Sequence, residues 1–243
     1  MCRAFYYCEK AMKYIINIIL LINFCFSSNI ETYNISFDRS VVESDILIDS
    51  YSGNLFSNKE FLFVDILSPI KQNFIIKANK TILYYPDENK AISIINDSYP
   101  IVPFFHTLKA FPLEDFGLSE KGYILDSTQF FSDKKIITSY WAPPEELQKN
   151  IHKLELSIKQ NNIVDVKSFN KEDVLVSSIQ FQKIKEYNKI LLPSEIIITG
   201  KNSIGGLITE TIIFNKIIIN APLPKKIIEF KLPNNIEIEE VEW

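Results

Sequence analysis

Cysteine, glycine and histidine are scarce in this chain of 243 residues. Its three cysteines, Cys2, Cys8 and Cys25, all lie near the N-terminus. Residues 26–243 therefore offer no thiol for a disulfide, a thiolate nucleophile or a cysteine-ligated zinc ion.

The glycines and histidines that are present form no recognisable site. None of the six glycines belongs to a phosphate-cradling pattern or to a Gly-x-Ser-x-Gly elbow. The two histidines, His106 and His152, are not within metal-ligand spacing of another strong ligand. We expect His106 to be a half-buried residue of a Phe-rich helix, not a catalytic base. The sequence thus predicts a protein that is not an enzyme and that holds no metal and no cofactor.

Charge and hydropathy favour a folded domain without affinity for nucleic acid. The chain has 26 basic and 30 acidic residues, a net charge of −4, and 47% hydrophobic residues. A small negative net charge gives no general attraction to the phosphate backbone of a nucleic acid. The hydrophobic residues are numerous enough to form a sizeable core.

The N-terminal segment has the pattern of an export signal. Met12-Lys13 precedes a short apolar run over 14–26, and Ser27-Ser28 follows it. This pattern predicts a cleaved signal peptide over residues 1–27 and one domain over 28–243. Met12-Lys13 is itself a conventional start of a signal peptide, so residues 1–11 are either part of the signal peptide or an upstream start-site artefact. Two alternatives stay open: a transmembrane anchor, and a lipid anchor on Cys25, although the bulky Phe24 precedes it.

Short extended segments separated by turn residues predict a mainly β fold. A first set is expected at 30–37, 46–55, 61–67, 73–78, 81–85 and 91–95, as an antiparallel meander. A second set is expected at 122–125, 136–141, 154–159, 163–168, 174–183, 195–199, 207–219, 227–231 and 236–241. No repeat or linker marks a domain boundary, so we expect one large sheet or partial barrel.

Two short helices interrupt this pattern. Pro103 suits a first helical turn, Pro112 ends the segment, and apolar residues recur between them at helical spacing: Phe104, Phe105, Leu108 and Phe111. The proline and glutamate residues of 143–149 indicate a second, weaker helix.

Consecutive apolar residues in three strands indicate that both of their faces are covered. These runs are 61–64, 196–198 and 217–219. Alternation places Phe61 and Phe63 on one face and Leu62 on the other. A packed sandwich core and a lipid-accepting cavity both explain such runs.

In their order and spacing, several motifs resemble the LolA/LolB superfamily of periplasmic lipoprotein carriers and outer-membrane lipoprotein receptors. The matching motifs are Ser52-Gly53-Asn54-Leu55, Phe61-Leu62-Phe63, Asn79-Lys80-Thr81 with Tyr85-Pro86, Pro103-Phe104-Phe105, and Phe230-Lys231-Leu232-Pro233. The resemblance implies an incomplete, unclosed antiparallel β-barrel with a short α-helical lid. One motif departs from the family, because Ser57-Asn58 stands where the carriers have an Arg-Pro pair associated with lid movement.

The resemblance also implies a function. It is that of a non-enzymatic periplasmic carrier, which binds the acyl chains of lipoproteins or lipid in an apolar cavity for transfer toward the outer membrane. An inner-membrane release complex and an outer-membrane receptor are the implied partners. The expected cavity residues are Phe61, Phe63, Phe104, Phe105, Leu108 and Phe111. The alternative is a lipid-binding or envelope-sensor protein with the same fold.

Overall fold

The computed structural model describes residues 30–77, 80–95, 103–202 and 205–242. The predicted signal peptide, including Cys25, lies outside these residues, and so does Asn79 of the resemblance. Within the described ranges, no helix is long and apolar enough to cross a membrane.

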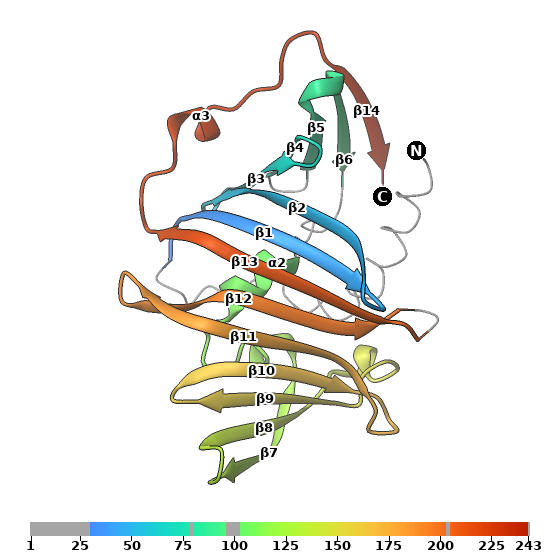
Figure 1. Ribbon diagram of the computed structural model, residues 1–243, viewed down its shortest axis with the longest axis vertical. Helices are drawn as coiled ribbons and strands as arrows, with labels where there is room; N and C mark the ends of the chain where they lie inside the picture. Colours follow the sequence, from blue (N-terminus) through green and yellow to red (C-terminus); the bar gives the residue numbers. More distant parts are fainter. Residues whose placement is uncertain (1–29, 78–79, 96–102, 203–204, 243) are drawn as a thin grey trace. The chain divides into compact units, whose positions relative to one another are not determined.

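In the part of the chain that the structure describes, fourteen strands form one sheet that does not close on itself (Figure 1). The strands are β1 (Tyr33–Glu43), β2 (Ile46–Ser57), β3 (Phe61–Ser68), β4 (Gln72–Lys77), β5 (Lys80–Tyr85), β6 (Lys90–Ile95), β7 (Ile124–Phe131), β8 (Ile136–Ala142), β9 (Lys153–Lys159), β10 (Asn162–Phe169), β11 (Leu175–Tyr187), β12 (Ile190–Lys201), β13 (Leu207–Ile219) and β14 (Glu237–Glu242). Their order is β14-β6-β5-β4-β3-β2-β1-β13-β12-β11-β10-β9-β8-β7. The edge strands β14 and β7 are not neighbours, and the predicted mainly β, unclosed fold is confirmed.

The short helices agree in part with the sequence-based prediction. Helix α2 (Pro103–Ala110) is present, but residues 143–149 contain only the single 3₁₀ turn η3 (Glu145–Leu147). The predicted strand at 227–231 is wrong, because the chain forms the one-turn helix α3 (Lys225–Ile228) there. Pro224 caps α3 and has no N–H for a strand ladder, and the turn directs Ile227 into a buried cluster.

Neighbouring strands from β2 to β6 and from β7 to β12 pair in antiparallel fashion. Strand β14 pairs with β6 in parallel, and Glu237 aligns with Lys90. Lys90 Nζ also forms an ion pair with Glu239 Oε2 at 3.0 Å. The C-terminal strand β14 therefore adds to the sheet beside β6 and runs in the same direction as β6, whereas the second strand of a hairpin would run antiparallel to it.

The chain divides into two compact units. Unit 1 contains Val41–Ile48 and Val102–Thr211, and unit 2 contains Asn29–Ser40, Asp49–Ile101 and Ile212–Trp243. Each unit has its own pattern of burial.

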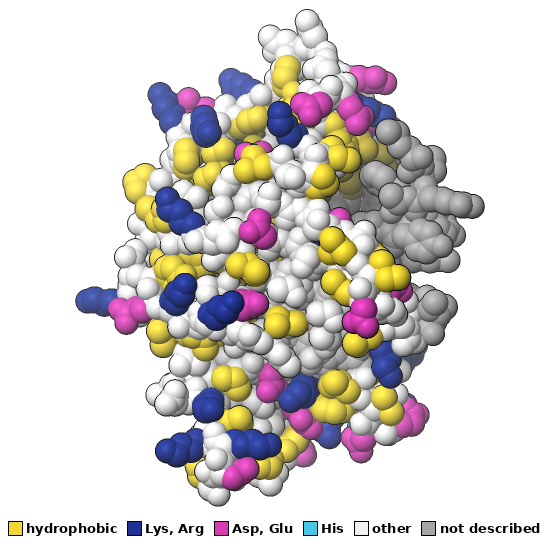
Figure 2. All heavy atoms as spheres, viewed as in Figure 1, with side chains coloured by type: hydrophobic (Ala, Val, Ile, Leu, Met, Phe, Trp, Pro, Cys, Tyr) yellow, Lys and Arg dark blue, Asp and Glu magenta, His cyan; other side chains and the backbone are white. Residues whose placement is uncertain are grey.

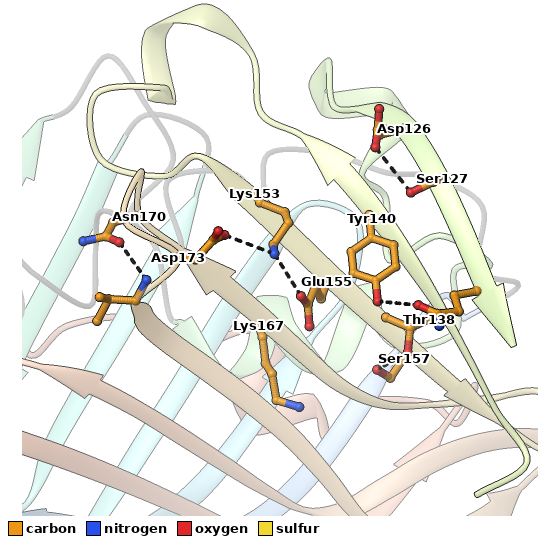
Figure 3. Close-up of polar contacts among 12 residues, drawn as sticks. Asp126, Ser127, Thr138, Tyr140, Lys153, Glu155, Ser157, Lys167, Asn170 and Asp173 are labelled. Carbon is orange, nitrogen blue, oxygen red and sulfur yellow. Dashed lines mark hydrogen bonds and ion pairs between the residues drawn. The ribbon is translucent and has the colours of Figure 1, made fainter. Parts of the chain in front are cut away.

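In unit 1 the strands alternate between an apolar and a polar face. The buried face of β9 to β12 carries Leu154, Leu156, Val166, Ile179, Phe181, Ile196 and Ile198. The opposite face carries charges, and Lys153 there forms ion pairs of 3.3 Å with both Glu155 and Asp173 (Figure 3). This pattern is typical of an antiparallel sheet with one packed and one solvated face.

In unit 2, strand β3 is buried on both faces. Phe61, Leu62, Phe63 and Val64 expose 6%, 4%, 3% and 3% of their surface. The prediction of two covered faces is confirmed for this strand. For the isoleucine runs it holds only in part, because the central residues Ile197 and Ile218 are half-buried.

Gly53 lies where β2 approaches β3 too closely for a side chain. A Cβ atom at this position would lie 2.4 Å from the carbonyl oxygen of Asp65. The register between the two strands also shifts between Ser52 and Gly53. Only glycine therefore fits at this bulge. The bulge sets the register between β2 and β3, and so it determines which residues of β3 lie beside which residues of β2.

Charges of both signs are spread over the surface. In the face drawn in Figure 2, lysines and carboxylates are interspersed among apolar side chains. This agrees with the small net charge of −4 and gives no single-sign surface there that would attract a polyanion.

Candidate functional site

One face of β3 carries a group of buried apolar residues that we call the aromatic cluster. Its members are Phe56, Phe61, Phe63, Ile75, Leu223 and Ile227, with the half-buried Ile82 and Phe230 against them. Phe63 aligns with Phe56 on β2 and with Ile75 on β4. Leu62 aligns with Ile76 and is not a member, so the two phenylalanines share a face as the alternation predicts.

The aromatic cluster is covered by a short segment near the C-terminus, residues 223–230, which we call the C-terminal cover. It contains α3 and contributes Leu223, Ile227 and Phe230. The ring centroid of Phe230 lies 5.0 Å from that of Phe63 and 6.3 Å from that of Tyr84. A helix of four residues has no stability of its own, so these apolar contacts hold the cover in place.

Polar groups surround the aromatic cluster without entering it. Lys77 Nζ lies 5.9 Å from the ring centroid of Phe61. Asp65 follows Phe63 on the same face, and its Oδ1 accepts a hydrogen bond of 2.8 Å from Asn73 Nδ2. Burial raises the pKa of Asp65, although this hydrogen bond and the charge of Lys226 act in the opposite direction. The centre of the cluster is therefore a dry apolar surface.

In unit 1, helix α2 buries the other predicted apolar residues. Phe104, Phe105, Leu108 and Phe111 are all buried. Helix α2 contacts β12, and the ring centroid of Phe111 lies 4.9 Å from that of Phe181 on β11. Phe111 follows the last helical residue, and its N–H donates to the carbonyl of Thr107 at 3.1 Å. The predicted apolar face of this helix is thus part of the core of unit 1.

Solved structures share this architecture, although no family model and no curated protein matches the sequence. A LolA superfamily protein from Nitrosomonas europaea is 14% identical, with a TM-score of 0.51 over 88% of this chain and 96% of that one. An outer-membrane lipoprotein-sorting protein domain from Vibrio parahaemolyticus is 11% identical, with a TM-score of 0.52 over 93% and 97%. The chain has a LolA-like fold.

A DUF1329 family protein from Desulfovibrio piger shares the LolA-like fold as well. It is 10% identical, with a TM-score of 0.56 over 91% of this chain and 97% of that one. Similarity at identities this low establishes the fold alone, so the function has to be argued from the residues themselves.

Ser57 and Asn58, which stand where the carriers have an Arg-Pro pair, lie at the turn between β2 and β3. Asn58 Oδ1 accepts hydrogen bonds from the N–H groups of Glu60 and Phe61 at 2.8 and 3.0 Å. Ser57 Oγ donates to the carbonyl of Phe61 at 3.2 Å. Both side chains are therefore used to close the β2–β3 hairpin.

The structure assembles the predicted cavity residues in two groups. Phe61 and Phe63 meet in the aromatic cluster of unit 2, and the other four residues lie on and just after α2 in unit 1. That both groups line one cavity stays a prediction. Sequence reasoning missed the C-terminal cover, for which the closely spaced prolines Pro222 and Pro224 were the available signal.

The described residues offer few groups for chemistry. Among them, no cluster of three or more histidine, cysteine, aspartate or glutamate side chains is placed to hold a metal ion. His106 lies on α2, where burial and then the charges of Lys109 and Lys121 lower its pKa to about 4. An imidazole of this basicity is neutral near pH 7.

Proposed function

We propose that the protein is a non-enzymatic periplasmic carrier that binds acyl chains of lipoproteins or lipid for transfer toward the outer membrane. The observation that supports this proposal is an aromatic sheet face, in a LolA-like fold, whose cover contains only one helical turn. An inner-membrane release complex and an outer-membrane receptor are the partners that such a carrier requires.

The aromatic cluster suits an acyl chain because rigid aromatic rings contact hydrocarbon without needing a fixed register. An acyl chain of about sixteen carbons gains on the order of 12 kcal/mol from full burial, at about 0.8 kcal/mol per CH₂. The three apolar side chains of the C-terminal cover gain roughly 4 to 9 kcal/mol by the same measure. An acyl chain can therefore replace the cover on Phe63, and a receptor that favours the covered state would release it.

Photo-crosslinking tests this competition. A photoreactive residue in place of Phe63 should crosslink to residues 223–230 in the empty protein and to the lipoprotein in the loaded protein. The same residue in place of Leu62, on the opposite face, should capture less lipoprotein. Equal capture at both positions, or at neither, would contradict the proposal.

A charge substitution gives an independent test. Phe63→Glu should abolish binding of a fluorescent fatty acid, because a carboxylate facing hydrocarbon has no partner there. Phe61→Glu is a weaker test, since Lys77 lies beside that ring and could pair with the new charge. The matched control is Lys59→Glu in the preceding exposed turn, which should bind the fatty acid normally.

A sensor or interaction protein is the second candidate. It is favoured by the low exposure of Phe63, 3%, which is typical of a permanently filled core. In that case the residue at position 63 would crosslink only to the C-terminal cover. Native mass spectrometry of the protein purified from its own cell envelope would then find no bound lipid or acylated protein.

A further inference from the structure

Strand β7 in unit 1 is an edge of the sheet, and it is more exposed than its neighbour β8. Seven of its eight residues are exposed and the eighth is half-buried. Ile124, Leu125 and Phe130 expose 71%, 51% and 63% of their surface. Among the strands that the structure describes, β7 pairs with β8 alone. Its outer edge therefore presents backbone N–H and C=O groups that a further strand can bond.

The two edges of the sheet differ in charge. Strand β14 has four glutamates among its six residues, and such like charges deter pairing with another copy of the strand. Strand β7 has one charged residue, Asp126, and no proline. Asp126 lies where the register with β8 shifts, and its Oδ2 accepts a hydrogen bond of 3.3 Å from Ser127 Oγ (Figure 3). Charge therefore protects β14 from edge-to-edge pairing and does not protect β7.

The residues of β7 follow a symmetric pattern of polarity. Two apolar residues, Ile124 and Leu125, begin the strand, and two others, Phe130 and Phe131, end it. The four residues between these pairs are polar. This pattern is the same from either end, so an antiparallel copy of β7 would align apolar with apolar and polar with polar residues.

The bulge in β7 extends this symmetry to the two faces of the sheet. Leu125 and Phe130 are five residues apart, so a regular strand would place them on opposite faces. Their partners on β8, Trp141 and Ile137, are four residues apart and share a face. Leu125 and Phe130 therefore share that face too, and in the same register the first and last residues of β7 share the other face.

We propose that two copies of this chain associate through β7, paired antiparallel with Thr128 on the twofold axis. In this register Thr128 lies opposite its own copy, and the bulged Asp126 has no residue opposite it, as in the pairing with β8. The remaining pairs join residues of like polarity across the interface: Ser127 with Gln129, Leu125 with Phe130, and Ile124 with Phe131. Each apolar residue of β7 thus contacts an apolar residue of the second copy.

This interface consists of β7 residues, so it does not depend on acyl-chain binding at the aromatic cluster. One pair of strands buries less surface than a standard protein interface, and we expect a weak dimer whose population rises with protein concentration. Sedimentation equilibrium of the exported protein, from micromolar to near-millimolar concentration, measures this association. A monomer over the whole range would overturn the proposal.

Charge substitution at Thr128 tests the register, because the twofold axis places this position opposite itself. Thr128 is exposed, so Thr128→Lys and Thr128→Asp should fold as the parent does. Each variant should associate about tenfold or more weakly than the parent, since two like charges would face each other. An equimolar mixture of the two variants should form dimers again, because each lysine then faces an aspartate. Parent-like association of either variant, or a mixture as weak as the single variants, would overturn the proposal.

A cysteine at the same position tests the pairing covalently. Residues 26–243 contain no cysteine, so one new thiol has only the thiol of a second copy to pair with. Thr128→Cys should give a disulfide-linked dimer under mild oxidation, because directly opposed residues of antiparallel strands lie close together. The matched control is Lys134→Cys in the exposed β7–β8 turn, which this register places far from its own copy. Equal crosslinking of the two variants would overturn the proposal, and so would capture of a different envelope protein in place of the second copy.

Discussion

The aromatic cluster of unit 2 and helix α2 of unit 1 both bury phenylalanine side chains, but they differ in what accompanies the rings. The aromatic cluster is apolar at its centre and has a cover of one helical turn. Helix α2 has eight residues and carries the half-buried polar residues His106 and Lys109 among its apolar residues. Low exposure alone therefore does not separate a core from a binding surface. The strength of the cover and the pairing of the polar groups are more informative.

The largest loss of stability should come from shortening an apolar side chain of α2. Phe104 exposes 2% of its surface, and we expect Phe104→Ala to lower the free energy of unfolding by about 3–5 kcal/mol. Urea-induced unfolding followed by circular dichroism measures this loss. A loss below about 1 kcal/mol, combined with weaker fatty-acid binding, would instead show that this ring lines a ligand cavity.

The second prediction concerns acid stability, which should fall because of a buried histidine on α2. The pKa of His106 is lowered from 6.5 to about 4, so the unfolded chain takes up this proton more readily than the folded protein. The resulting stability is complete above pH 6.5 and is lost as the pH falls toward 4, by about 3 kcal/mol in total.

His106→Gln should remove most of this pH dependence, because glutamine has no proton to gain in this range. His152→Gln is the control and should follow the parent curve. Unfolding by urea at pH 7, 5.5 and 4 gives the comparison. Parallel curves for the parent and His106→Gln would contradict the prediction.

A smaller effect should distinguish the C-terminal cover from a core element. Phe230 is half-buried against Phe63, so we expect Phe230→Ala to cost about 1–2 kcal/mol of stability. Because the ring of Phe63 is then less well covered, the affinity for a fluorescent fatty acid should rise several-fold. An unchanged or lower affinity would show that Phe230 is itself part of the binding surface or of a permanent core.

The sequence predicts the elements whose signals are local. Pro103 and the phenylalanine spacing located α2, and alternation placed Phe61 and Phe63 on one face of β3. Helix α3 was mistaken for a strand because two consecutive isoleucines within a lysine-rich stretch favour an extended chain in isolation. Its actual conformation depends on Ile227 reaching the aromatic cluster, which is a tertiary effect.

The contacts of Asp115 could not be predicted from spacing. Asp115 is only six residues from Lys121 and from Lys109. On the sequence alone, an ion pair is a reasonable expectation. The structure commits the carboxylate of Asp115 to the backbone N–H groups of Gly117 and Ser119. Such competition between backbone and side chain is decided only when the loop has folded.

The smallest effect concerns the β2–β3 turn, where this chain departs from the Arg-Pro pair of the carriers. Asn58→Ala removes the acceptor of two backbone N–H groups that the turn uses, so we expect a loss of about 1 kcal/mol in the free energy of unfolding. Lys59→Glu, the neighbouring control, should change stability by only a few tenths of a kcal/mol, because Lys59 and its partner Glu31 expose 64% and 75% of their side chains. Fatty-acid binding per folded molecule should be unchanged in both variants, since neither residue belongs to the aromatic cluster. If Asn58→Ala altered fatty-acid binding more than stability, the β2–β3 turn would control access to Phe61 and Phe63. The difference between the two regions would then depend on this turn as well as on the weak cover of the aromatic cluster.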